Sequence, residues 1–267
     1  MFVVDLTFDC YQDTTLEQAE QAINRLVNAL RFNGQIMGEE FPTVLKDGFF
    51  ITRVMCPTED AMHPLNNSPF VKHSIEKLHS AGLLAPKVKV IGQDIHSNGA
   101  DCCKEPSSYI LYTTYVHTCS PLYCGDDFLP VPLFRIPAIA NGDYKTLIKW
   151  QEDWQACDQI QINGATRCEF PALEEISSIK SDLYRRGKDI TKRISFLTKK
   201  PTYYYLYRVG GVDKASELER KCPSCNGDWK LPESWFGLFD FRCEPCGLVS
   251  NISWDFHNHF NECLKSA

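Results

Sequence analysis

The sequence lacks any long apolar run. None of its 267 residues lies in a stretch that approaches the roughly 18 to 20 apolar residues of a membrane-spanning helix. The N-terminus also lacks a basic stretch followed by a small-residue cleavage site, and Asp5 and Asp9 come early, so no signal peptide is predicted. We therefore expect a cytoplasmic protein, and we interpret Phe2–Cys10 as a first β-strand.

The short motifs of common catalytic sites are also missing. The sequence contains no phosphate-binding P-loop, no GxGxxG turn, no GxSxG nucleophile elbow and no HExxH helix. Its paired carboxylates, such as Asp126-Asp127, are adjacent in sequence and would point apart on a regular element. These absences favour a protein that is not an enzyme.

Excess positive charge is absent from most of the chain. The sequence has 28 basic and 34 acidic residues, which gives a net charge of −6. Only residues 180–200 are strongly basic, with 8 basic and 2 acidic side chains. Most of the affinity for nucleic acid comes from basic side chains that neutralise its phosphates. An acidic protein is therefore better suited to bind a basic protein than a nucleic acid.

Cysteine, by contrast, is abundant, and four of the thirteen cysteines have metal-ligand spacing. Cys222 and Cys225 are separated by two residues, and after seventeen more come Cys243 and Cys246. Two such pairs predict a zinc ribbon with one structural Zn²⁺, because four thiolates fill a tetrahedral ion and leave no position for substrate. The alternative is that these thiols are buried or redox-active. His257 and His259 could replace a ligand, but a solvated tail is the simpler interpretation.

A second group of thiols is less regular. His117, Cys119 and Cys124 could hold another metal ion, or His117 could activate one cysteine as a nucleophile. Their spacing matches no recognised metal-binding turn, and intracellular cysteines are often only buried. Both alternatives remain open from the sequence.

The basic segment offers a different function. Arg185, Arg186, Lys188, Lys192 and Arg193 lie on one predicted helix, and Tyr203–Arg208 follows it with four tyrosines. Cations for phosphates beside rings for bases are typical of a surface for single-stranded nucleic acid. The alternative is a solvated helix face followed by an ordinary strand.

Hydrophobic periodicity predicts an α+β protein with three regions. Residues 1–95 have the β-α-β-β-α-β order of a ferredoxin-like sandwich, residues 96–210 form a second α/β region with a long basic amphipathic helix, and residues 211–267 form the ribbon and a tail. In the first region, strands are expected near 35–44, 49–55 and 87–91, and helices from Leu16 and over 69–81. In the second, strands are expected at 109–117, 130–136, 159–162 and 203–209, with helices over 143–156 and from 176 to 197.

Several longer motifs resemble a known family. The motifs are Phe32-Asn-Gly-Gln-Ile, Cys119-Ser-Pro-Leu-Tyr-Cys-Gly, Trp150-Gln-Glu-Asp-Trp-Gln-Ala-Cys-Asp and Tyr204-Tyr-Leu-Tyr-Arg-Val-Gly-Gly. They are similar to a bacterial family of unknown function that is described as zinc-ribbon-containing and as a candidate for nucleic-acid binding. Some of its relatives appear beside secreted antibacterial toxins, which implies an immunity role. Only the four zinc ligands carry over to this chain residue by residue.

Together these observations predict a non-enzymatic zinc-ribbon protein. The expected function is that of an immunity protein, an antitoxin that binds a cognate toxin and occludes it. The alternative is a nucleic-acid-binding regulator that uses the helix over 180–200 and Tyr203–Arg208.

Overall fold

The computed structural model describes residues 1–97, 99–254 and 256. The chain is α+β with two β-sheets, and its contacts divide it into two compact units. The first unit comprises residues 1–106 and 116–149, and the second comprises residues 107–115 and those from Trp150 onward. None of the helices in the described part of the chain combines the length and hydropathy that crossing a bilayer requires.

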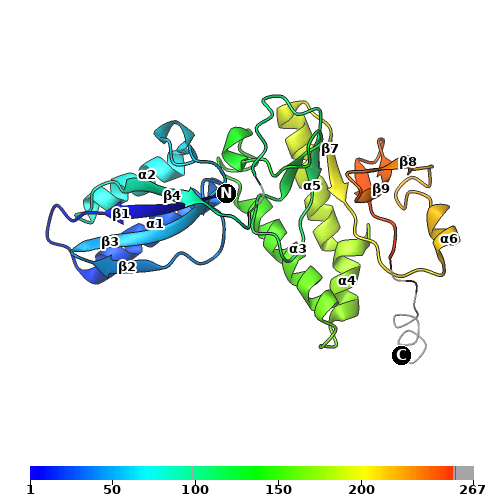
Figure 1. The fold of residues 1–267 in the computed structure, drawn as a ribbon, viewed down its shortest axis with the longest axis horizontal. Helices are drawn as coiled ribbons and strands as arrows, with labels where there is room; N and C mark the ends of the chain where they lie inside the picture. The colour runs from blue at the N-terminus through cyan, green and yellow to red at the C-terminus, as the bar shows by residue number, and fades with distance from the viewer. Residues whose placement is uncertain (98, 255, 257–267) are drawn as a thin grey trace. The chain divides into compact units, whose positions relative to one another are not determined.

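The first unit contains a four-stranded antiparallel sheet with the strand order β2-β3-β1-β4 (Figure 1). The β-α-β-β-α-β order predicted for the first region is present. The elements are β1 (Phe2–Phe8), α1 (Leu16–Phe32), β2 (Thr43–Lys46), β3 (Phe49–Cys56), α2 (Pro69–Ser80) and β4 (Lys87–Gln93).

Local sequence signals account for these elements. The predicted capping box of α1 is confirmed, because the Thr15 side chain accepts from the Gln18 amide while the Gln18 side chain accepts from the Thr15 amide. Asp47 and Gly48 make the turn between β2 and β3 with φ angles of 52° and 84°, a left-handed conformation that suits Gly and Asp. Alternate residues of β1 and the apolar stripe of α1 then meet in one core.

Two predicted strands of this unit are wrong in extent or type. Most of the segment 35–44 is not a strand, because the buried Gln35 side chain donates to the Ala61 carbonyl at 2.9 Å and holds the segment in a loop. The segment 130–136 forms a short 3₁₀ turn, Leu133–Arg135, since Pro130 and Pro132 have no amide to donate to a ladder. The unit also contains the 3₁₀ turn Pro64–Asn66 and the short strand β6 (Leu122–Cys124).

The second unit has a mixed sheet with the order β5-β7-β10-β9-β8. Its strands are β5 (Tyr109–Leu111), β7 (Thr202–Tyr205), β8 (Lys230–Trp235), β9 (Phe239–Cys243) and β10 (Leu248–Ser250). β7 pairs in parallel with both β5 and β10, whereas β8, β9 and β10 pair antiparallel. The strands between and after the four cysteines therefore continue a sheet that begins about 120 residues earlier in the sequence, at β5.

The helices of this part of the chain correct two further predictions. The segment 159–162 is helical and belongs to α3 (Lys145–Asn163), which starts in the first unit and continues in the second. The single helix predicted from 176 to 197 is two helices, α4 (Glu169–Ser177) and α5 (Asp182–Thr198). Ser181 begins α5, because its hydroxyl accepts from the Tyr184 amide at 3.0 Å. The short helix α6 (Lys214–Leu218) precedes the cysteine segment.

Gly187 allows α5 to pack closely on β7. A Cβ atom at this position would lie 2.2 Å from Tyr204 Cε2 and 2.8 Å from Trp150 Nε1. The glycine that weakens the helix in isolation is therefore the residue that lets the helix and the buried aromatic rings approach each other.

Candidate metal centre

Four cysteines of the second unit converge on one point. The Sγ atoms of Cys222, Cys225, Cys243 and Cys246 all lie within 4.8 Å of one another, and Cys225 Sγ is 3.6 Å from Cys243 Sγ. Cys222 and Cys243 are buried, Cys246 is half-buried and Cys225 is exposed. The convergence that the CxxC spacing predicted is confirmed.

The first cysteine pair lies in a tight turn. The Cys222 amide donates to the Gly227 carbonyl at 2.9 Å, and the Cys222 carbonyl accepts from the Asn226 amide at 2.8 Å. Asn226 has a left-handed backbone, with φ at 59°. The amides of Ser224 and Cys225 face the Cys222 sulfur. The turn therefore brings two backbone donors and the Cys225 thiol close to the Cys222 thiol.

The second pair follows β9 directly. Cys243 is the last residue of β9, the Cys246 amide faces its sulfur, and Gly247 takes the left-handed conformation with φ at 56°. Lys188 of α5 braces this turn, because its ammonium donates to the Cys246 carbonyl at 2.7 Å and to the Gly247 carbonyl at 3.0 Å. The helix thus holds the main chain of the turn in place.

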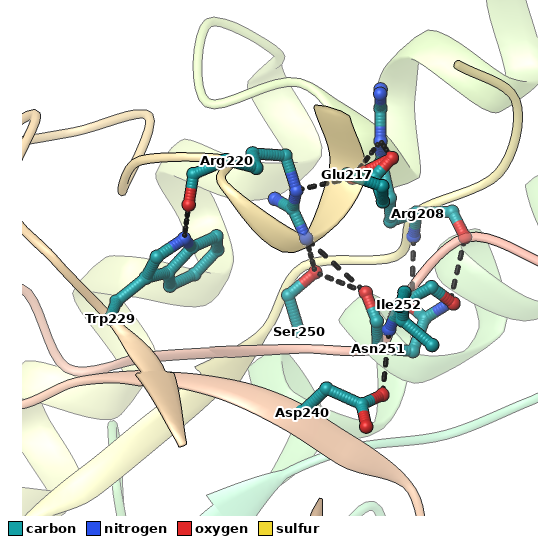
Figure 2. A network of polar contacts seen from close by, with 8 residues as sticks. All are labelled: Arg208, Glu217, Arg220, Trp229, Asp240, Ser250, Asn251 and Ile252. Carbon is teal, nitrogen blue, oxygen red and sulfur yellow. Dashed lines mark hydrogen bonds and ion pairs between the residues drawn. The ribbon is translucent and has the colours of Figure 1, made fainter. Parts of the chain in front are cut away.

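A polar network holds the chain around the cluster (Figure 2). The buried Glu217 carboxylate lies between two guanidinium groups, 3.0 Å from Arg208 Nε and 2.5 Å from Arg220 Nε. Arg220 also donates to Ser250 Oγ at 3.1 Å, and its backbone carbonyl accepts from the Trp229 indole at 2.9 Å. These contacts tie the segment before Cys222 to the sheet that contains Cys243.

The donor set fits one tetrahedral metal ion. Zinc–sulfur bonds of about 2.3 Å place the sulfur atoms of such a site about 3.8 Å apart, close to the 3.6 Å between Cys225 and Cys243. Backbone amides that face the sulfurs of Cys222 and Cys243 offset part of the negative charge that four thiolates accumulate. The four residues therefore form a closed site in which the protein itself can supply every ligand.

The thiols differ in how readily they ionise. The Gly227 amide and then the neighbouring cysteine thiols lower the pKa of Cys225 to about 7. Burial raises the pKa of Cys222 and of Cys243. Of these three thiols, the exposed Cys225 is therefore the one that ionises most readily.

The basic residues predicted for nucleic acid have partners within the second unit. Arg186 pairs with Asp153 at 2.7 Å and Arg185 pairs with Asp182 at 2.9 Å. Lys192 lies 3.9 Å from Asp189, and Arg193 lies over the Phe196 ring. Lys188 is half-buried against the second cysteine turn, and burial lowers its pKa to about 8.

Three of the four tyrosines that follow are buried and not on the surface, and the fourth, Tyr207, is half-buried. All four residues of β7 are buried, so Tyr203, Tyr204 and Tyr205 belong to the core. Tyr203 donates to Glu244, and Tyr205 donates to Asn251 Oδ1 at 3.1 Å. Rings packed in this way offer no stacking surface for bases.

Lys188 provides a test of how α5 and the cysteine turn depend on each other. We expect Lys188→Met to lower the free energy of unfolding of the second unit by about 1.5–3 kcal/mol, because it removes charged hydrogen bonds to two carbonyls. Urea titration followed by tryptophan fluorescence measures this, since all five tryptophans lie in the second unit. Lys192→Met is the control, because that side chain is 74% exposed. Equal stability of the two variants would contradict the bracing role.

The second predicted thiol group is arranged differently from the sequence interpretation. Among the described residues, Cys124 forms a three-ligand group with Asp101 and Cys103, and not with His117 and Cys119. Cys119 Sγ lies 3.1 Å from the Tyr123 hydroxyl, and the His117 ring packs near the ring of Tyr123. Burial raises the pKa of Cys124 to about 12 and also raises that of Cys119. The predicted alternative ligands His257 and His259 lie outside the described residues.

Comparison with known proteins adds the family. Three family models match the chain, each described as a domain of unknown function: DUF8589 over residues 1–92, DUF2310 over 103–207 and DUF8594 over 211–256. A Haemophilus influenzae protein is 40% identical over 250 residues, which covers 91% of this chain and 95% of that protein. The chain belongs to this bacterial family. A second H. influenzae relative is 43% identical over 177 residues, covering 66% of this chain and 86% of its own.

Both relatives in the family are named uncharacterized proteins, so they bring no activity to this chain. Among solved structures, a Deinococcus radiodurans protein described as a candidate antibiotic biosynthesis monooxygenase matches with a TM-score of 0.26 and 20% identity. The match covers 37% of this chain and the whole of that protein.

Proposed function

We propose that this chain is a non-enzymatic zinc-ribbon protein of the immunity type, which binds a cognate toxin and occludes it. Cys222, Cys225, Cys243 and Cys246 hold one structural zinc ion. The ferredoxin-like first unit supplies the surface that contacts the toxin. In this proposal the protein meets the toxin in the cytoplasm.

The closed set of four thiols supports the structural role of the metal. Soft thiolate ligands favour zinc, and a site whose four positions are all filled by protein leaves none for water or substrate. The metal then acts through the shape that it gives to the sheet of the second unit.

One surface feature of the first unit carries the binding proposal. A groove of about 390 Å³ lies between α1 and β2, and its walls include Leu16, Phe41, Leu45 and Phe50. Leu16 is 65% exposed and Leu45 is 62% exposed. Large apolar side chains that gather on one exposed surface mark a site of protein contact.

The charge around this groove favours a basic partner. The first unit contains 17 acidic and 12 basic residues, whereas the second contains 17 and 16. Glu20 lines the groove, and the exposed Glu39 and Glu40 immediately precede Phe41. A groove that combines apolar side chains with Glu20, Asn24 and Thr43 fits a partner that offers apolar side chains flanked by lysine or arginine.

Co-expression with the protein encoded beside this gene tests the proposal. We expect the full-length chain to restore growth against that protein and to co-purify with it. Leu45→Lys should weaken the complex by at least about tenfold, because it places a cation in the groove. Leu65→Lys is the matched control, since Leu65 is 88% exposed in the same unit and lies outside the groove. The proposal fails if no stable complex forms, or if the two variants behave alike.

The same preparation tests the nucleic-acid alternative. Its supporting observation is a cavity of about 400 Å³ whose lining includes Lys180, Arg185, Lys188 and Lys192. We expect no binding of a fluorescent single-stranded oligonucleotide at physiological salt, because the tyrosines of β7 are buried and the exposed Arg185 and Lys192 pair with acids. Binding that decreases with salt and is lost in Arg185→Glu would instead favour the regulator.

A further inference from the structure

The turn after β6 in the first unit has the backbone of a metal-binding turn. The Cys124 amide donates to the Leu129 carbonyl at 2.9 Å, and the Cys124 carbonyl accepts from the Phe128 amide at 3.0 Å. The Asp126 amide donates to Cys124 Sγ at 3.4 Å, and the Asp127 amide faces the same sulfur. Phe128 has φ at 57°.

Each of these features has its counterpart at Cys222. There the cysteine amide also donates to the carbonyl five residues on, and the cysteine carbonyl accepts from the amide four residues on. The residue four positions on, Asn226, has φ at 59°, and the amides two and three positions on face the sulfur. The two turns therefore share their hydrogen-bond pattern, although only Cys222 belongs to a CxxC pair. Asp127 occupies the position that Cys225 holds in the other turn.

Phe128 has a left-handed backbone conformation, which its own side chain disfavours. A left-handed conformation is uncommon for any residue other than glycine, asparagine or aspartate, and it is a strained one for a bulky aromatic residue. The Phe128 ring stacks on Tyr123, with centroids 4.7 Å apart. The surrounding contacts thus hold a turn that points two amides at one sulfur.

Two further ligands are brought to Cys124 from a separate segment. The Asp101 amide donates to the Pro130 carbonyl at 3.0 Å, and Arg135 donates to the Asp101 carbonyl at 3.0 Å. The Cys103 amide donates to Asp101 Oδ1 at 2.7 Å, which orients the buried carboxylate. A carboxylate oxygen of Asp101 and the sulfurs of Cys103 and Cys124 then lie within 4.8 Å of one another.

We propose that Asp101, Cys103 and Cys124 form a second zinc site, in the first unit and separate from the four-cysteine cluster. Two thiolates and one carboxylate are ligands that zinc accepts, and the thiolates favour it over magnesium or calcium. Three protein ligands leave one position for water or another small ligand, unlike the closed set of four cysteines. The site stands on its own residues and does not depend on the toxin-binding function.

Metal analysis of the full-length protein tests the second site. We expect two equivalents of zinc per chain in the purified wild-type protein, and one in Cys103→Ser and in Asp101→Asn. Cys103 is exposed and asparagine keeps the shape of Asp101, so both variants should fold. Cys102→Ser is the matched control, because Cys102 is an exposed neighbour outside the group and should leave both equivalents bound.

Cys225→Ser separates this proposal from the structural zinc of the second unit. It should remove one equivalent and leave the ion at Asp101, Cys103 and Cys124. A wild-type protein with a single equivalent that Cys225→Ser removes would overturn the second site and leave the four-cysteine site intact. A disulfide between Cys103 and Cys124, seen by mass spectrometry of the unreduced protein, would also overturn it.

Discussion

Cys225→Ser is expected to unfold the segment that contains the four cysteines, although the Cys225 side chain is exposed. In a site without metal, replacing an exposed thiol by a hydroxyl changes almost nothing. In the proposed zinc site it removes one of four thiolates, and the whole site contributes about 10–16 kcal/mol in small zinc-dependent domains. The strands β8 and β9 are short, so their order depends on that contribution.

Hydrogen exchange is the direct measurement of this effect. We expect protection of the amides in 221–250 to fall to that of an unfolded chain in Cys225→Ser, and a strong zinc chelator to have the same effect on the wild-type protein. The sheet of the first unit should keep its protection, because it has a separate core. Cys168→Ser is the control for thiol chemistry alone, since Cys168 is also exposed but lies outside the cluster. Unchanged protection in Cys225→Ser would rule out a structural metal at this site.

Glu217→Gln is expected to lower the free energy of unfolding of the second unit strongly, although it changes one charge and keeps the shape of the side chain. The Glu217 side chain is 1% exposed and faces the guanidinium groups of Arg208 and Arg220. Glutamine keeps the shape but removes the negative charge, and two cations are then left close together around a buried amide. Loss of one partner from a buried ion pair costs about 3–5 kcal/mol, which is a large part of the stability of a typical domain.

Denaturant unfolding of zinc-saturated protein, followed by tryptophan fluorescence, measures the cost. Asp228→Asn is the matched control, because Asp228 also pairs with a cation but its side chain is 91% exposed. We expect that control to stay within about 0.5 kcal/mol of wild type, as for most surface substitutions. If Glu217→Gln were as stable as the control, the network of Figure 2 would contribute little to folding.

The buried pairing also explains why a short helix stands before the cysteines. α6 has five residues, too few for an isolated helix to be stable in water. The Asp213 side chain caps it by accepting from the Ser216 amide at 2.8 Å, and the buried Glu217 anchors its last turn. The helix thus depends on tertiary contacts that sequence propensity does not contain.

Local patterns were enough to predict the order of the helices and strands in the first sheet, though not the bounds of β2. The apolar stripe of α1, its capping box and the Asp47-Gly48 turn all act over a few residues, so each can be recognised from sequence. Predictions failed where a distant group decided the outcome. The segment 35–44 is mostly a loop, because the Gln35 side chain donates to the Ala61 carbonyl. The long helix that periodicity alone predicts from 176 is interrupted before Ser181, whose hydroxyl caps the start of α5.

For the sites, the sequence by itself determined the four cysteines of the second unit, because two residues between thiols is a local geometry that any CxxC turn can adopt. Only the tertiary structure decided that the tyrosines of β7 are buried, that Arg186 pairs with Asp153 and that Lys188 donates to the Cys246 carbonyl. Only it decided, too, that Cys124 lies with Asp101 and Cys103 and not with Cys119. The reason is the same in each case. These placements depend on contacts between segments that lie some 20 to 60 residues apart, and such contacts cannot be predicted from the spacing of residues along the chain.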